Sequence, residues 1–480
     1  MNSAAVAGPL RVATAVLLLS GCASLAPPHA VPALPVAGRY PVDAPAAGTG
    51  VAAAGLGWRE YFADPHLHRL IAQALAHNRD LRSAALRVRE ARAAHDAQRA
   101  ERFPAIGIAA DGSRSRVPGD LNVSGRPLTA GQYDIGFGTS AWELDFWGRL
   151  SNLQDVALEN ELATEAARRA VALALIAQVA DGDLTLRELD ERVALARRTV
   201  TSREESLRIF TRRFEVGATS KLDLTQVRTL LTQAQSLGAQ LAQARAAQAH
   251  ALGLLVGGPI DPLPAEDRFD DAAVARELRA GLPAELLANR PDIIAAEHRL
   301  RAAGANIGAA RAAFFPRVTL TGSLGTASAG LEGLFAPGSR AWRFAPSLLV
   351  PVFDAGRNRA GLDLAETRRD LAVADYEKTV QAAFREVSDA LSARQWLAEQ
   401  VRIQRMALDA QTERARLAKL RYDSGAAAFL EVLDAQRDLL AAEQQLVQVR
   451  RAQLSARVAL YAALGGGAQP AAAARHDDDD

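Results

Sequence analysis

An internal duplication constrains the fold of this chain more than any other sequence feature. The stretch from Arg421 to Arg437 (RYDSGAAAFLEVLDAQR) is echoed from Arg213 to Leu224 (RFEVGATSKLDL), with aromatic, glycine, leucine and acidic residues at matching positions. The two turn glycines, Gly217 and Gly425, are 425 − 217 = 208 residues apart, and further pairs share this offset: Gly148 with Gly356, and Gly257 with Gly465. An upstream block repeats at an offset of 212, which places Asp80 on Asp292 and Phe103 on Phe315. The chain is therefore predicted to contain two copies of one structural unit.

Each copy is predicted to contain one very long helix. Apolar residues recur in steps of three and four from Gly148 to about Arg213, and again from Gly356 to about Leu420. A helix of about 65 residues is roughly 100 Å long, far beyond the usual length in a globular protein. The glycine turns near Gly217 and Gly425 follow these helices and reverse the direction of the chain.

The helices that return from the turns, at about 220 to 256 and 428 to 464, are only half as long. Each therefore needs a second helix to continue it along its long partner, and the helical patterns at about 66 to 102 and 283 to 312 are predicted to do so. The result is a long antiparallel helical rod with both glycine turns at one end. We expect the proline-rich, acidic connection at 258 to 282 midway along the rod.

Two segments, about 105 to 147 and 317 to 352, have the period of two that is typical of strands. Tyr133, Ile135 and Phe137 alternate with small or acidic residues, and Trp342 and Phe344 alternate with Arg343 and Ala345. Four strands of about ten residues are predicted, which is the length of a tilted membrane strand. Open sheet edges do not occur in hydrocarbon and the smallest transmembrane barrels have about eight strands, so a barrel requires two or three copies of the chain. Alternation alone also fits amphipathic hairpins on a soluble protein.

The N-terminus is typical of a bacterial lipoprotein signal. Arg11 precedes a short apolar run at 12 to 19, and Leu-Ser-Gly-Cys follows at 19 to 22. Residues 1 to 21 are predicted to be a signal peptide that is cut before a lipidated Cys22, although a chance cysteine in an ordinary signal peptide is the alternative. Ala23 favours the outer membrane as the destination. Residues 22 to 55, rich in proline, alanine and glycine, are predicted to be a tether.

Composition argues against several classes of function. The 56 basic and 55 acidic residues leave a net charge of +1, which gives no electrostatic basis for binding nucleic acid. Cys22 is the only cysteine, so disulfides and Cys-based zinc sites are excluded. The eight histidines, including His66 and His68, form no metal-ligand motif, and no nucleophile and base cluster together, so no enzyme is predicted. The histidines and the charged helix faces are expected to be solvated.

Two smaller features carry no function of their own. Asp181-Gly182-Asp183 lacks the rest of a calcium loop, and its glycine is expected to relieve helix packing or bend the helix. The tail at 468 to 480 is predicted to be disordered. No metal or cofactor is predicted, apart from the covalent lipid on Cys22.

Four further motifs complete the pattern: GLPAELLANRPD at 281 to 292, ANIGAARAAFFP at 305 to 316, WELDFWGR at 142 to 149, and LDAQR at 433 to 437. Together with the duplication and the N-terminal signal, they resemble the TolC-like outer-membrane efflux proteins, in the lipoprotein branch that serves resistance-nodulation-division pumps. The resemblance covers essentially the whole mature chain.

The resemblance implies a mainly α-helical fold with a small β part. Such proteins are homotrimers, whose twelve strands form one β-barrel in outer-membrane lipid and whose helices form a long periplasmic α-barrel. The implied function is an exit duct that passively conducts small molecules, with an inner-membrane pump and a periplasmic adaptor as partners. An exit duct for type I protein secretion is the alternative within the family. A structural coiled-coil lipoprotein would explain the helices but leaves the strands without a role.

The resemblance also assigns roles in the two turns. Asp434 matches an acid of the aperture ring, Leu430 a hydrophobic gate residue, and Arg437 a basic neighbour. The remaining matches are two further constriction acids and an aromatic that helps to close the tip: Glu431, Asp223 and Tyr422. Ala427 stands where some relatives carry a basic locking residue, which favours a hydrophobic seal at Leu430 over an ionic lock. Without the resemblance, these acids are equally well placed to cap the helices after the turns.

Overall fold

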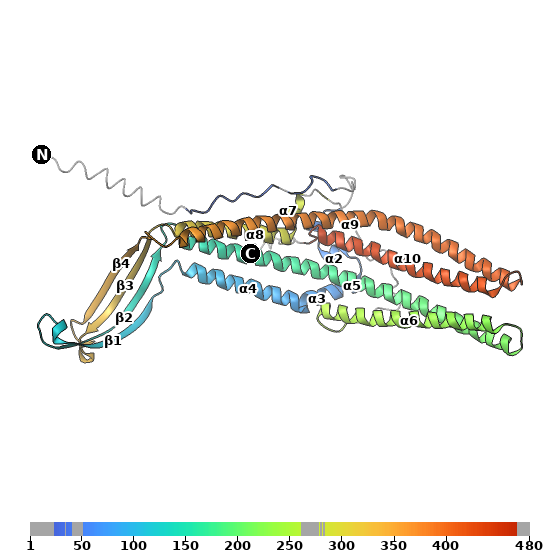
Figure 1. Ribbon diagram of the computed structural model, residues 1–480, viewed down its shortest axis with the longest axis horizontal. Coiled ribbons are helices and arrows are strands. Elements are labelled where there is room, and N and C mark those ends of the chain that lie inside the picture. Colours follow the sequence, from blue (N-terminus) through green and yellow to red (C-terminus); the bar gives the residue numbers. More distant parts are fainter. Residues whose placement is uncertain are drawn as a thin grey trace, which may run out of the picture. The chain divides into compact units, whose positions relative to one another are not determined.

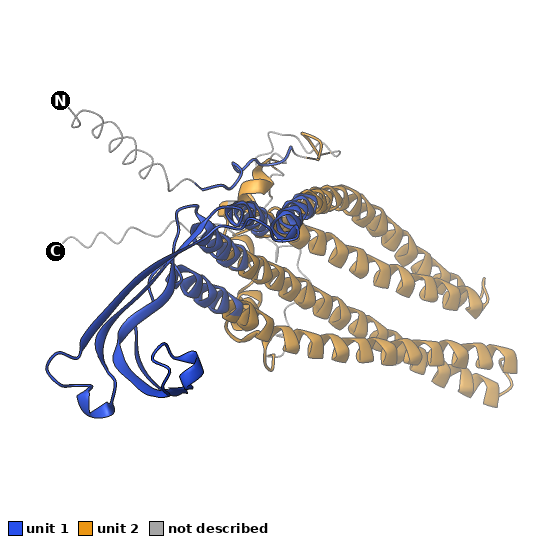
Figure 2. Cartoon of the chain, turned by 60° about the vertical axis from the view of Figure 1, so that its left-hand side comes forward, with its two compact units in different colours: residues 1–33, 87–164, 295–376 blue, residues 34–86, 165–294, 377–480 orange. Residues whose placement is uncertain are grey.

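The computed structural model describes residues 24–33, 35–40, 51–260, 278, 281 and 284–467. The predicted signal peptide, Cys22, most of the 258–282 connection and the tail from 468 lie outside the described residues. The chain forms two compact units, each assembled from segments that are far apart in the sequence (Figure 2). Unit 1 comprises 1–33, 87–164 and 295–376, and unit 2 comprises 34–86, 165–294 and 377–480.

Unit 1 contains one antiparallel sheet with the strand order β1-β2-β3-β4 (Figure 1). Its strands are β1 (Gly107–Val117), β2 (Leu128–Leu144), β3 (Arg317–Ser328) and β4 (Arg340–Leu349). The prediction of four strands is confirmed, but β2 has 17 residues instead of about ten. An irregularity between Thr139 and Trp142 interrupts its pairing with β3, and Ala141 there has a φ of 52°. Such a bulge lets a long strand bend.

The register of the sheet places large apolar side chains in one row across all four strands. Ile108 pairs with Phe137, Phe137 with Leu324, and Leu324 with Trp342. Their exposed fractions are 69, 60, 50 and 74%. The neighbouring row, on the opposite face, contains only small residues: Ala109, Gly136, Gly325 and Ala341. The alternation therefore produces one face with a row of large apolar residues, which are exposed in the single chain, and an opposite face with a row of small residues.

The sequence motifs at the base of the sheet contact one another. The indole ring of Trp147 stacks on Phe315 with centroids 4.7 Å apart, and its Nε1 donates to the carbonyl of Pro316 at 2.8 Å. The carboxylate of Glu143 accepts two 2.8 Å hydrogen bonds from Arg149 and lies 3.0 Å from Nε of Arg317. The aromatic and ionic contacts join the end of β2 to the start of β3, so the WELDFWGR and FFP motifs fix the base of the sheet.

Two long helices of equal length reflect the duplication. Helices α5 (Arg149–Glu215) and α9 (Arg357–Asp423) each have 67 residues, close to the predicted extents. Each starts beside an aspartate whose carboxylate accepts backbone N–H groups: Asp145 from Leu150 and Ser151, and Asp354 from Gly356 and Asn358. These contacts satisfy donors that have no partner within the first turn of a helix.

The returning helices, α6 (Lys221–Val256) and α10 (Phe429–Ala463), also match their predicted ranges. The helices expected at 66–102 and 283–312 do not run uninterrupted, and this prediction was wrong. The first consists of α3 (Pro65–His77) and α4 (Arg79–Ala100), and the second of α7 (Glu285–Asn289) and α8 (Pro291–Ala312). Single residues, Asn78 and Arg290, separate them, and 290 − 78 = 212 is the offset of the upstream repeat.

Each break lies where a returning helix ends. Gly257 has a φ of 75° and is so close to α3 that a Cβ would lie 2.5 Å from the carbonyl oxygen of His77. The Asn78 amide donates to the carbonyl of Leu255 at 2.9 Å, and its oxygen accepts from N–H of Leu81 at 2.9 Å. Asn78 thus ends one helix, begins the next and satisfies a terminal carbonyl of α6.

The second break repeats this arrangement with a different side chain. A Cβ at Gly465, which has a φ of 74°, would lie 2.7 Å from the carbonyl oxygen of Asn289. Nη1 of Arg290 donates to the carbonyl of Ala463 at 3.0 Å. The breaks therefore supply the polar groups that the buried ends of α6 and α10 require.

The remaining short elements line the core of unit 2 or connect the strands: η1 (Ala53–Gly55), α2 (Trp58–Tyr61), η2 (Gly119–Leu121) and η4 (Leu331–Gly333). The rings of Tyr61 and Tyr461 stack 4.3 Å apart, and their hydroxyls donate to the carbonyls of Arg457 and Leu56. Burial raises the pKa of both phenols. None of the described helices combines the length and apolar character needed to cross a lipid bilayer.

The start of the described N-terminal segment, at Ser24 and Leu25, contacts two helices of unit 1. The hydroxyl of Ser24 donates to the side-chain oxygen of Asn152 in α5 at 2.7 Å. Nη1 of Arg311 in α8 donates to the carbonyl of Leu25 at 3.2 Å. Residues 24 and 25 are thus held to both repeats.

Candidate functional site

Both turns predicted to form the tip have the same backbone structure. Gly217 and Gly425 each have a φ of 76°, a conformation that favours glycine. Equivalent hydrogen bonds close the two turns: Gly217 N–H to Phe214 and Ala218 N–H to Arg213, and Gly425 N–H to Tyr422 and Ala426 N–H to Arg421. The second bond of each pair spans five residues, as in a Schellman motif. The duplication is therefore preserved down to individual hydrogen bonds.

Asp223 caps helix α6. Its carboxylate accepts from the hydroxyls of Ser220 and Thr219 at 2.7 and 3.0 Å and from N–H of Ser220 at 3.2 Å, while Asp223 N–H donates to the Ser220 hydroxyl. The two residues form a complete capping box. These hydrogen bonds, led by that from the Ser220 hydroxyl, lower the pKa of Asp223. The capping role anticipated for the turn acids is thus present at this position.

The second turn has no such cap. Ala428 occupies the N-cap of α10 and offers no side-chain acceptor. The acids of this turn pair with arginines instead: Glu431 with Arg421 at 3.2 Å, and Asp434 with Arg437 at 3.3 Å. All four side chains are at least 40% exposed, and exposed pairs contribute only about 0–1 kcal/mol. The second turn therefore lacks the capping hydrogen bonds that the first turn has.

An aromatic cluster joins the second turn to α5. The ring of Phe429 lies 4.4 Å from that of Phe210 and 4.9 Å from that of Tyr422. Nη1 of Arg213 donates to the Tyr422 hydroxyl, and its guanidinium lies 5.8 Å from the centre of that ring. The predicted site residue Tyr422 thus lies at the contact between α5, α9 and α10.

Leu430 has a different environment. Its side chain is 46% exposed, and its counterpart Leu222, at 430 − 208, is 67% exposed. Large apolar side chains exposed at both turns leave an apolar surface at the tip in the single chain. Within one chain the described residues do not bring Leu430, Glu431 and Asp434 together with Asp223, so any ring of these residues requires further copies.

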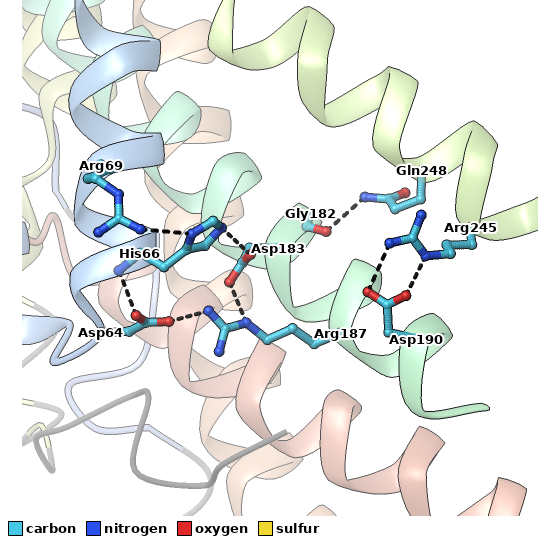
Figure 3. Close-up of polar contacts among 9 residues, drawn as sticks. All are labelled: Asp64, His66, Arg69, Gly182, Asp183, Arg187, Asp190, Arg245 and Gln248. Atoms are coloured by element: carbon cyan, nitrogen blue, oxygen red, sulfur yellow. Dashed lines mark hydrogen bonds and ion pairs between the residues drawn. The ribbon is translucent and has the colours of Figure 1, made fainter. Parts of the chain in front are cut away.

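A second cluster, which the sequence did not reveal, lies at 181–192 of α5 and is here called the polar belt. Its charged members are Asp181, Asp183, Arg187, Glu188, Asp190 and Arg192. Figure 3 shows its centre, where Nε of Arg187 donates to Asp183 at 2.8 Å and Nη2 donates to Asp64 at the start of α3. Nε2 of His66 lies 3.8 Å from the other oxygen of Asp183.

The side chains at the centre of the belt are buried. His66, Asp183 and Arg187 are 5, 1 and 6% exposed, so the expectation that histidines and helix charges are solvated was wrong here. Burial raises the pKa of Asp183, while the charges of Arg187 and His66 oppose this shift. No group of three metal-ligating side chains occurs in the part of the chain that the structure describes. The ion pairs of Arg187 with Asp183 and Asp64 make the belt a buried ion-pair network.

The belt also binds two other helices. Arg245 of α6 donates to Asp190, and the Gln248 amide of α6 donates to the carbonyl of Gly182 at 3.0 Å (Figure 3). A Cβ at Gly182 would lie 3.3 Å from Leu252, in agreement with the close packing expected of this glycine. On the α10 side, Arg451 donates to Glu188 at 2.9 Å, and Nε of Arg192 donates to the Gln444 side chain at 2.6 Å. Helix α5 is thus held to α3, α6 and α10 over three turns.

The sequence contains one signal that pointed to the belt. Asp183 with Arg187 and Glu188 with Arg192 are spaced four residues apart, as ion pairs on a helix are. They lie beside the apolar stripe that includes Val179 and Leu186, both buried. Charged pairs so close to a buried stripe indicate burial rather than a solvated face.

Comparison with known proteins identifies the family. A family model described as "Outer membrane efflux protein" matches residues 70–258 and again residues 282–466. The starts of the two matches are 282 − 70 = 212 residues apart and their ends 466 − 258 = 208, which are the two offsets at which the sequence repeats.

Close relatives cover nearly the whole chain. The solvent efflux pump outer membrane protein SrpC of Pseudomonas putida is 45% identical over 94% of this chain and 97% of its own length. The outer membrane protein OprJ of Pseudomonas aeruginosa is 42% identical over 94% of each chain.

Solved structures agree with these sequence relatives. A membrane protein from Pseudomonas aeruginosa has a TM-score of 0.87 at 41% identity, over 92% of this chain and all of its own. The open state of the Neisseria gonorrhoeae outer membrane channel MtrE has a TM-score of 0.84 at 36% identity, over 93% of this chain and 99% of its own. The chain therefore belongs to the outer membrane efflux protein family, and is an outer-membrane transport protein with no enzymatic role.

Proposed function

We propose that this protein is the exit duct of a tripartite efflux pump, a homotrimer that passively conducts small molecules from an inner-membrane resistance-nodulation-division pump and a periplasmic adaptor to the outside. The observation that carries the proposal is the sheet of unit 1. One face carries a row of four exposed apolar residues, and its outer strands, β1 and β4, each pair on one side only. In a lipid environment such edges must pair with other strands. Three copies supply 3 × 4 = 12 strands, enough for a closed barrel.

The internal duplication supports a ring of copies. The belt face of α5 is covered by α10, through pairs such as Glu188 with Arg451. The same face of α9, 208 residues later, is exposed in the single chain: Trp396 is 58%, Ile403 45% and Met406 51% exposed. Their spacing of seven and three residues is that of a helix-packing seam.

The pseudo-symmetry suggests what covers this face. If α9 is packed as α5 is, its cover is the equivalent of α10, which is α6 of a neighbouring copy. Trp396 corresponds to Glu188, so it would face Gln243 (451 − 208) of that copy. Each copy would use its α9 to contact α6 of the next copy. Such a head-to-tail contact generates a closed ring when the rotation between neighbouring copies is a simple fraction of a full turn.

The tip residues are proposed to form the constriction of the duct. Three-fold symmetry would turn Leu430 into an apolar ring and Asp434 and Glu431 into acidic rings, flanked by Arg437, with Asp223 nearby. An apolar ring hinders hydrated solutes, and a carboxylate ring concentrates cations. Tyr422, held by Arg213, would keep the turns together. Adaptor binding near the tip would shift the equilibrium towards an open state.

Two further points complete the proposal. Lipidation of Cys22 would add an anchor in the outer membrane, although one acyl chain alone binds weakly. The small-molecule cargo is proposed by analogy with relatives named for solvent and toluene efflux.

The proposal can be tested on the mature protein purified in mild detergent. Mass measurement and electron microscopy should show a trimer with a hollow helical part and a short barrel. A monomer or a solid filament would contradict both the barrel and the transport function.

A further inference from the structure

Between the polar belt and the tip, α5 buries an arginine, Arg203, that has no ion-pair partner among the described residues. Arg203 is only 4% exposed, and no described group accepts a hydrogen bond from its Nη1. A buried guanidinium ordinarily has a carboxylate or carbonyl partner, because removing a charge from water without compensation costs several kcal/mol. Arg203 therefore makes an unfavourable contribution to the conformation described here.

A second arginine, Arg437 on α10, adds to this unfavourable contribution. Burial lowers the pKa of Arg203, and the positive charge of Arg437 on α10 lowers it further. Arg437 is itself paired with Asp434 and Asp438, at 3.3 and 3.1 Å. Arg203 on α5 and Arg437 on α10 thus repel each other electrostatically across the contact between these two helices, here called the α5–α10 seam.

Elsewhere the α5–α10 seam is complementary. On the belt side, Arg192 and Gln444 exchange two hydrogen bonds, at 2.6 and 3.1 Å. On the tip side, Phe210 packs on Phe429. Arg203 therefore lies between two different contacts of this seam. The contact on the belt side is polar, and the contact on the tip side is apolar and can separate without leaving an unpaired charge.

We propose that Arg203 destabilises the closed α5–α10 seam near the tip, so that this seam separates when the duct opens while the polar belt holds. The reason is the solvation of the charge. When α10 moves away from α5, Arg203 gains water and distance from Arg437, so its charge favours the open state. This inference rests on the proposed function and adds to it the residue that sets the balance between closed and open.

The duplication provides an internal comparison. The positions equivalent to Arg203 and Arg437 are Gln411 (203 + 208) and Thr229 (437 − 208), both uncharged. If α9 of one copy packs on α6 of the next, that seam has uncharged residues at these two positions. The α5–α10 seam within each chain would then differ from the α9–α6 seam between copies at these positions. Only the α5–α10 seam would contain the pair of arginines that favours separation.

The experiment uses the full-length protein in planar lipid bilayers. Arg203→Gln, which installs the residue of the other repeat, should reduce the open fraction about tenfold, the effect of a change of about 1.4 kcal/mol. Arg203→Glu should reduce it further, because a carboxylate there can pair with Arg437.

The matched control is Arg208→Gln, which removes an exposed arginine of the same helix that pairs with Glu205. It should leave the open fraction unchanged. An unchanged or increased open fraction in Arg203→Gln would overturn the inference, and so would an equal effect of the control. If Arg203→Glu does not fold, Arg203→Gln still tests the proposal. Its midpoint of thermal unfolding should be higher than that of the wild type, and a lower midpoint would count against the proposal. A wild-type protein that forms no channel at all would instead refute the proposed function.

Discussion

Two regions of the same helix, α5, hold similar ion pairs in opposite environments. In the polar belt, the buried side chains of Arg187 and Asp183 pair with each other. Two turns before the tip, Arg208 and Glu205 pair at 2.6 Å, but their side chains are 67 and 54% exposed. Removing one partner of a buried pair costs about 3–5 kcal/mol, whereas an exposed pair contributes about 0–1 kcal/mol. The comparison indicates that α5 is fixed at the belt and free to change neighbours near the tip.

The largest expected effect is at the belt. Arg187→Met leaves the buried Asp183 and the partly buried Asp64 without their cation and should destabilise the fold by about 3–5 kcal/mol. Arg208→Met near the tip should cost less than about 1 kcal/mol. Thermal unfolding of the two variants, followed by circular dichroism, measures the difference. Equal shifts of the unfolding midpoint would show that the belt does not hold α5 more firmly than the tip pairs do.

A smaller effect is expected from the backbone of the tip. Gly425→Ala places a Cβ at a φ of 76° and should cost about 1–2 kcal/mol. The matched control is Gly361→Ala in α9, where a Cβ meets nothing within 4 Å and the helix should gain about 0.5–1 kcal/mol. Unfolding midpoints should therefore move in opposite directions. Shifts in the same direction would mean that the turn does not need glycine.

The two tip turns can be distinguished by their caps. Ser220→Ala removes the N-cap of α6 and should cost about 1 kcal/mol, and Ala428→Ser should strengthen the uncapped α10. Hydrogen exchange in the first turn of each helix measures this directly. We expect faster exchange in α6 for the first variant and slower exchange in α10 for the second. If neither rate changes, the caps do not determine the stability of the turns.

The sequence predicted regular elements well and local exceptions poorly. The 67-residue helices follow from a sustained apolar period, because such a signal accumulates over many turns. The break at Asn78 was missed because it is one residue, whose amide contacts a carbonyl of a helix far away in the sequence. The break at Arg290 has a local signal that was overlooked, since Pro291 follows it and begins α8. The charges of the belt were predicted to be solvated. The sequence alone does not show that this part of α5 is covered by three other helices. The roles of the tip residues were assigned by resemblance, because the proposed rings would form only between copies of the chain.

The smallest expected effect is a pH dependence at the first turn. The lowered pKa of Asp223 means that its carboxylate stabilises the folded state at any pH above its ordinary pKa. This contribution is lost as the pH falls through the lowered value, because the protonated acid is a weaker acceptor. Asp223→Asn should therefore be less stable than the wild type at neutral pH, and the difference should shrink as the pH falls to about 3. Thermal unfolding across this range measures it, and a constant difference would exclude the capping carboxylate as its cause.

The central claim is that the tip of a trimeric duct is its constriction. The most direct test is the single-channel conductance of Leu430→Ala with Asp434→Ala, compared with the wild type in planar bilayers. Loss of the apolar ring and of one acidic ring should raise the conductance severalfold and weaken the preference for cations. An unchanged, low conductance with unchanged selectivity would contradict the account, because the constriction would then lie elsewhere in the duct.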